Sequence, residues 1–148
     1  MPEALTTLHG RRLGIAATGN LVANSITATP ICTDASITVG AEDTNVRAIT
    51  IQLKDSNGKD VAERTVVEAF VFADANGDAF ATTGGSTGIA IGTDGALLAL
   101  VAKKAFVLIS EADGDIDLTW TDTGTEAAYL ALRLPTGRVI ISSALTNA

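Results

Sequence analysis

The 148 residues are enough for one domain with a hydrophobic core, or for a smaller domain with an appended segment. Hydrophobic residues make up 47% of the chain and aromatic residues only 4%, so the core must consist mainly of Val, Ile, Leu and Ala, which suits sheets packed on sheets. The net charge of −7 argues against a nucleic-acid partner, because phosphate binding needs clustered Lys and Arg.

Several kinds of site and segment are excluded by single features. Cys32 is the only cysteine, which rules out an intrachain disulfide and a cysteine-based zinc site and fits assembly in a reducing compartment. The longest apolar run, 96–102, ends at two lysines and is too short to cross a membrane. The start, Met-Pro-Glu-Ala, has no basic region followed by an apolar one, so we expect no secretory signal and no membrane partner.

Residues 1–24 differ from the rest in pattern and in charge. Their apolar residues follow neither a helix nor a strand period, and Arg11, Arg12 and Glu3 give +1, which leaves −8 for residues 25–148. This pattern predicts an N-terminal arm that becomes ordered on contact with the body or with a neighbour, although a strand and turn packed on the parent domain is an equal alternative. The candidate residues for contact with a partner or a neighbouring subunit are Leu8, His9, Arg11, Arg12, Leu13 and Ile15.

Residues 25–45 are rich in Ser, Thr and Ala, with breakers at Pro30 and Gly40. They are either a linker or short edge strands over 26–31 and 36–39, because proline lacks the donor that a central strand needs. The boundary of the main domain is placed near Glu42, with the domain itself over 46–148.

The clearest hairpin signal is the stretch 49–72. Ile49, Ile51 and Leu53 alternate with polar residues, as in a strand with one buried face. An Asp-Ser-Asn-Gly turn follows, and Asn-Gly supplies the positive φ angles of a tight reversal. A Val- and Phe-rich return over 66–72 then predicts a paired β unit.

Further strands and turns follow at short intervals. A turn at 74–78 leads into a Thr- and Gly-rich loop over 79–88 that we expect to be exposed and mobile. Strands are predicted over 96–101, 103–110, 115–121, 128–134 and 138–144, followed by a short tail. The strand over 103–110 is apolar on both faces, which indicates a central strand. Strand 115–121 alternates cleanly and directs Trp120 inward.

Seven or eight strands, turn signals about every 8–12 residues and no helix of ordinary length predict an all-β fold. The expected architecture is an antiparallel immunoglobulin-like β-sandwich with the arm appended, with a jelly roll as the alternative.

No catalytic, cofactor-binding or metal-binding constellation is predicted. His9 is the sole histidine and would have to reach a hydroxyl from the arm, so we do not expect an enzyme. Asp74, Asn76 and Asp78 begin like a calcium loop, but Gly85 stands where the closing Glu belongs, so a polar turn is the interpretation.

Two other polar stretches also favour structural interpretations. The acidic cluster Glu111, Asp113, Asp115 and Asp117 is interpreted as solvated carboxylates, with a weak cation site between subunits as the alternative. The glycine-rich stretch 84–88 lacks the Lys-Ser/Thr of a phosphate-binding loop and opens no helix.

The stretch ITIQLKDSNGKDVAERTVVEAFVF resembles the opening of bacterial Ig-like domains of the invasin kind, and Gly-Asp-Ile-Asp-Leu at 114–118 resembles a later strand of the same domains. The arm LHGRRLGIAATGNLVA, one such domain and the ending VIISSALTNA resemble small virion proteins of tailed bacteriophages that decorate, or cement, the head. The resemblance implies a non-enzymatic homotrimer on the capsid surface, bound to the major capsid protein and assembled in the host cytoplasm. The alternative is a tail or fibre module that recognises a host glycan or protein.

Overall fold

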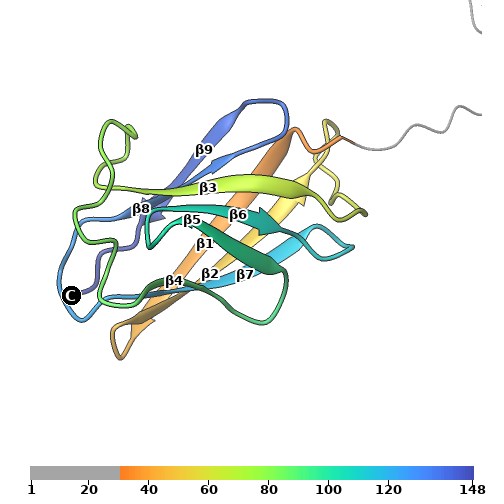
Figure 1. The fold of residues 1–148 in the computed structure, drawn as a ribbon. Coiled ribbons are helices and arrows are strands. Elements are labelled where there is room, and N and C mark those ends of the chain that lie inside the picture. Colours follow the sequence, from red (N-terminus) through yellow and green to blue (C-terminus); the bar gives the residue numbers. More distant parts are fainter. Residues whose placement is uncertain (1–30) are drawn as a thin grey trace, which may run out of the picture.

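The computed structural model describes residues 31–148, and the predictions for residues 1–24 and 25–30, including the six candidate contact residues of the arm, lie outside this range. The described part is an all-β sandwich of two antiparallel sheets that lie face to face (Figure 1). Within this range no helix is long and apolar enough to cross a membrane.

Four strands form one sheet, in the order β1 (Asp34–Asp43), β2 (Val46–Lys54), β7 (Asp115–Thr121) and β4 (Gly88–Ile91). Five strands form the other, in the order β5 (Ala96–Val101), β6 (Ala105–Ile109), β3 (Val66–Phe72), β8 (Tyr129–Arg133) and β9 (Val139–Ala144). The predicted sandwich is therefore confirmed, with nine strands among the described residues in place of the expected seven or eight.

Alternating side chains from both sheets fill the core. On β7, Ile116, Leu118 and Trp120 are buried, which confirms the inward direction expected for Trp120. The predicted inward set Ala128, Leu130, Leu132 and Leu134 is also buried. The core is thus mainly aliphatic, as the low aromatic content required.

The predicted hairpin between residues 49 and 72 is wrong, because β2 and β3 belong to different sheets. The turn itself forms: Asp55 Oδ1 accepts the amides of Asn57 and Lys59, at 2.8 and 3.0 Å. After one bridge between Lys54 and Asp60 the pairing ends, and Val61 is buried in the core. The chain then crosses to the opposite sheet, where β3 pairs with β6 and β8.

Both ends of the described chain lie within the sandwich. β1 is an edge strand that includes the strand predicted over 36–39, so the sandwich extends upstream of residue 46, whereas residues 26–30 of the other predicted strand lie outside the described range. At the other end Leu145 is fully buried. The side-chain amide of Asn147 donates to the backbone carbonyls of Asn45 and Asp122, which holds the C-terminal tail against the β1–β2 turn.

Candidate functional site

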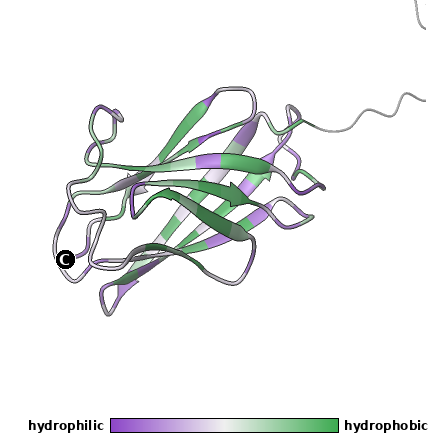
Figure 2. Ribbon diagram, viewed as in Figure 1, coloured by the Kyte–Doolittle hydropathy of each residue, from purple (hydrophilic) through white to green (hydrophobic). Residues whose placement is uncertain are grey.

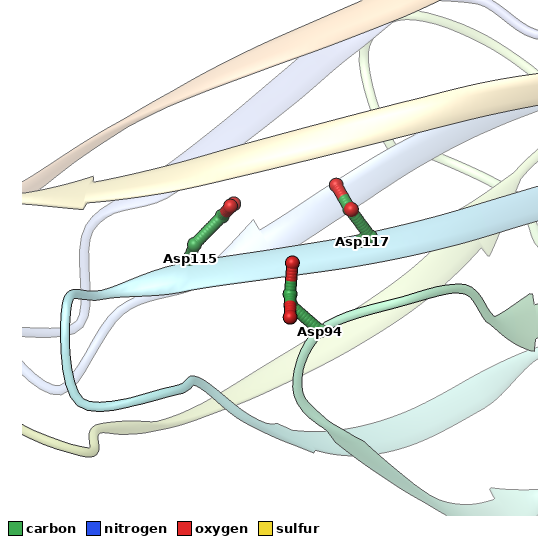
Figure 3. Close-up of side chains that lie close together, drawn as sticks. All are labelled: Asp94, Asp115 and Asp117. Carbon is green, nitrogen blue, oxygen red and sulfur yellow. The ribbon is translucent and has the colours of Figure 1, made fainter.

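Three aspartates gather on the outer face of the four-stranded sheet. Asp115 and Asp117 point outward from β7, and Asp94 comes from the turn between β4 and β5 (Figure 3). The Asp117 amide donates to the Asp94 carbonyl at 2.9 Å, which holds this turn against β7. One carboxylate oxygen of each residue lies within 4.8 Å of the others.

Partial burial and the neighbouring negative charges make ionisation of Asp115 unfavourable. Partial burial, followed by the charges of Asp117, Asp94 and Asp113, raises the pKa of Asp115 above its ordinary value. Asp115 Oδ1 has no hydrogen-bond partner among the described residues, whereas Asp117 Oδ1 accepts a bond from Thr50 Oγ1 at 3.1 Å. The cluster therefore costs stability when it is fully ionised.

Carboxylate oxygens are ligands of the kind that Ca²⁺ and Mg²⁺ prefer, and these three could present them to one ion. Calcium takes six to eight oxygens, so three carboxylates supply only part of a coordination shell. The outward direction predicted for Asp115 and Asp117 is confirmed, but both are half-buried rather than fully solvated. Asp94 was missed, because it joins the cluster only through the pairing of β4 with β7.

The turn that begins like a calcium loop is closed by its own backbone. Asp74 Oδ1 accepts the amides of Asn76, Gly77 and Asp78, at 2.8, 2.8 and 3.3 Å. Hydrogen bonds from the Asn76 and Asp78 amides lower the pKa of Asp74. The interpretation as a polar turn is confirmed.

The loop over 79–88 is exposed only in part: six of its ten residues are exposed as expected, whereas Ala81, Gly84, Gly85 and Gly88 are buried. Gly85 has φ +80°, and a Cβ there would lie 2.8 Å from Trp120 Cη2, so only glycine fits over the indole. Lys103 Nζ donates to the carbonyls of Gly85 and Ser86, at 3.1 and 2.6 Å. The loop is therefore a fixed cover over Trp120.

Two carboxylates bind the amides of this loop. Glu126 accepts from Thr83 Oγ1, from the Thr83 amide and from the Gly85 amide, at 2.6, 2.7 and 2.9 Å. Asp122 Oδ1 accepts the Ser86 amide at 3.0 Å. Partial burial opposes the ionisation of Glu126, but the hydrogen bonds from Thr83 and the loop amides outweigh it and lower its pKa to about 2. The amides of this loop are thus hydrogen-bonded to the protein's own carboxylates.

The outer face of the five-stranded sheet is apolar over most of its area, and we call it the apolar face. Figure 2 colours β5 and β6 as hydrophobic along their lengths. Most of the residues of β5, β6, β3 and β9 that point away from the core are exposed or half-buried hydrophobic side chains: Val66, Phe70, Leu98, Val101, Val107, Ile109 and Val139.

Aromatic rings cover one end of the apolar face. The rings of Phe72 and Phe80 stack with centroids 5.2 Å apart, and Phe70 lies 6.0 Å from Phe72. Tyr129 pairs with Phe72 across β3 and β8. Phe80 belongs to the loop after β3 and remains 50% exposed, so this cluster is open to solvent on one side.

A single ion pair interrupts the apolar face. Arg133 Nη1 lies 3.0 Å from Glu68 Oε2 across β8 and β3. The strand register places Leu98 and Val107 on one side of this pair and Val139 on the other. The charged groups therefore neutralise each other in the middle of hydrophobic surroundings.

No protein-family model, curated protein or solved structure matches this chain.

Proposed function

We propose that this protein is a non-enzymatic structural protein that decorates and stabilises the outer surface of a tailed-bacteriophage capsid. In this proposal it is a homotrimer on the virion surface, and residues 1–24 contact the major capsid protein or a neighbouring subunit. The sequence resemblance suggests the virion, and the use of polar groups within the sandwich supports a structural role.

The observation that carries the proposal is that the carboxylates which could have formed a reactive or binding site instead form hydrogen bonds that stabilise turns and loops. Asp55 and Asp74 accept the amides of their own turns, and Glu126 and Asp122 hold the glycine-rich loop. Groups committed in this way are not poised to bind or activate a substrate. Such a domain offers surfaces, and weak surface contacts repeated on a lattice add through avidity.

We also propose that the sandwich is of the immunoglobulin-like type, and the order in which its strands pair supports this. If β1, β2 and β7 correspond to strands A, B and E, and β3, β8 and β9 to C, F and G, the observed pairs are those of that fold. β4 then takes the place of strand D beside β7. The hairpin of β5 and β6 is an addition that extends the sheet next to β3.

Retention on purified phage heads tests the role of the arm. We expect deletion of residues 1–24 to abolish binding to heads that lack this protein, and charge reversal of Arg11 and Arg12 to weaken it. Reversal of Lys59, which is exposed on the body, is the control. Unchanged occupancy after the deletion contradicts the assignment of the arm, and absence of binding by the intact protein contradicts the capsid role.

The aromatic cluster favours a second function, recognition of a host glycan or protein by a tail or fibre module. An exposed ring such as that of Phe80 can stack on a sugar, as aromatic side chains in binding sites do. A glycan array probed with the intact protein and with Phe80→Ala separates the functions. Binding that depends on Phe80 supports recognition, and absence of binding favours the structural role.

A further inference from the structure

We propose that the apolar face is the surface through which copies of this chain associate. The occupant of the face is then a second copy of the protein, which covers the hydrophobic side chains of β5, β6, β3 and β9. This self-association shares with the proposed function only the expectation of an oligomer, and it does not require a capsid.

The size of the face fits an interface between subunits. Val66, Leu98, Val101 and Val139 are between 53% and 64% exposed, and Ile109 and Phe80 are 37% and 50% exposed. On soluble proteins, contiguous apolar patches larger than about a few hundred Å² mark interaction sites. Stable interfaces bury about 800 Å² on each partner, with an apolar centre and a polar rim, so the face supplies the centre of such a contact.

The charge distribution directs any contact between two copies to the apolar face. Residues 31–148 hold 8 of the 10 Lys and Arg and 16 of the 17 Asp and Glu, which gives a net charge of −8. Two such bodies repel each other unless they meet where charge is low. On the apolar face the only ion pair, Glu68 with Arg133, is neutral, and a second copy brings the same pair with its charges free to exchange partners across the contact.

The geometry of the face also suits a copy of itself. The face is one side of a five-stranded antiparallel sheet, and the other side already packs against a sheet within the sandwich. Twisted sheets of the same hand pack face to face with their alternate side chains interdigitated. The face of a second copy offers the same twist and the same spacing of side chains.

Charged substitutions on the two outer faces test the proposal in the intact chain. Val66→Glu with Leu98→Glu adds two carboxylates to the apolar face at exposed positions. Ser36→Glu with Thr38→Glu adds the same charge to exposed positions of β1 on the opposite face and is the matched control. Sedimentation velocity and light scattering at micromolar concentration give the mass, and circular dichroism with thermal unfolding checks the fold.

We expect the unchanged protein and the control to be oligomers, and the Val66→Glu, Leu98→Glu variant to be a folded monomer. Its association should weaken at least about 100-fold, because like charges would face each other across the contact. A monomeric unchanged protein overturns the proposal, whether residues 1–30 or another molecule covers the face. A variant that still assembles as the control does also overturns it.

A nitroxide label provides a measurement that does not depend on charged substitutions. The label is attached to Leu98→Cys, and to Thr38→Cys as the control, while the native Cys32 is buried. We expect the label at position 98 to lose mobility as protein concentration rises, and the label at position 38 to stay mobile. A label at position 98 that stays mobile overturns the proposal. Because no capsid is present, either failure leaves the head-binding experiment to decide the capsid role separately.

Discussion

The two outer faces of the sandwich cover the same core but present different chemistry to solvent. The outer positions of β1, β2 and β7 carry Thr38, Thr50 and Asp117, whereas those of β3, β5 and β9 carry Val66, Leu98 and Val139. Both sheets obey the same alternation on the inside. The comparison teaches that inward positions specify the fold, while the outward positions of one sheet remain available for assembly.

The largest effect should come from the same substitution made at an inward position of one sheet and at an outward position of the other. Leu118→Ala removes a side chain that is 1% exposed and should lower the free energy of unfolding by about 2–5 kcal/mol. Leu98→Ala, at 64% exposure, should change the stability of the monomer by less than about 0.5 kcal/mol. Urea unfolding in dilute solution measures both, and equal losses would remove the distinction between core and apolar face.

The next effect concerns Glu126, which holds the loop that joins the two sheets. Glu126→Gln should cost on the order of 2 kcal/mol at neutral pH, because the amides of Thr83 and Gly85 lose a charged acceptor. Since the pKa of Glu126 is lowered to about 2, its contribution is present above the ordinary carboxyl pKa of 4.5 and is lost as the pH falls toward 2.

Urea unfolding across this acidic range measures the contribution of Glu126. The exposed Glu63, whose side chain has no hydrogen bond to the described residues, supplies the control Glu63→Gln. If the two variants lose stability equally at every pH, the loop does not depend on Glu126.

A smaller effect, of opposite sign, is expected on the polar outer face. Asp117→Asn should raise stability by about 0.5 kcal/mol at neutral pH, because it removes one of the charges that repel Asp115. In the unchanged protein the raised pKa of Asp115 makes its contribution most favourable below the ordinary carboxyl range, and that contribution is lost as the pH rises through the raised pKa.

NMR titration of the Asp115 carboxyl group should show its pKa falling in the Asp117→Asn variant. Asp78→Asn makes the same charge change on an exposed turn and should leave Asp115 unaffected. A drop in stability for Asp117→Asn would mean that the bond from Thr50 outweighs the repulsion.

The smallest effect is expected at the ion pair of the apolar face. Glu68→Gln should change the stability of the monomer by less than about 0.5 kcal/mol, since both side chains are substantially exposed there. Unfolding of the dilute protein measures the change. A loss as large as that expected for Leu118→Ala would show that the pair supports the sandwich itself.

Local alternation was enough to predict much of the sandwich. The pattern of residues 115–121 identified β7 and the direction of Trp120, because a strand's faces alternate whatever its neighbours are. The neighbours themselves were not predictable in this way. The Asp-Ser-Asn-Gly turn reverses the chain through bonds to Asp55, and these bonds form equally well whether β2 then pairs with β3 or leaves it.

The strand now assigned as β6 shows how a pattern can be interpreted correctly in part. Apolar residues on both faces predicted a central strand, and β6 does lie between β5 and β3. One of those faces nevertheless belongs to the open apolar face, where Val107 is half-buried and Ile109 exposed. A run of apolar residues indicates that both faces of a strand are hydrophobic. It does not indicate which element or partner packs on each face.

The amino-acid sequence by itself determined an all-β chain with an aliphatic core, the strands with a clean period of two and the polar turn at Asp74. Only the tertiary structure decided the partition of β2 and β3 between sheets, the burial of the glycine-rich loop under Glu126 and the approach of Asp94 to Asp115. The physical reason is the separation along the chain of the residues that interact. Periodicity and turn chemistry act over a few residues, whereas sheet pairing and loop burial depend on contacts between distant segments that compete for the same core.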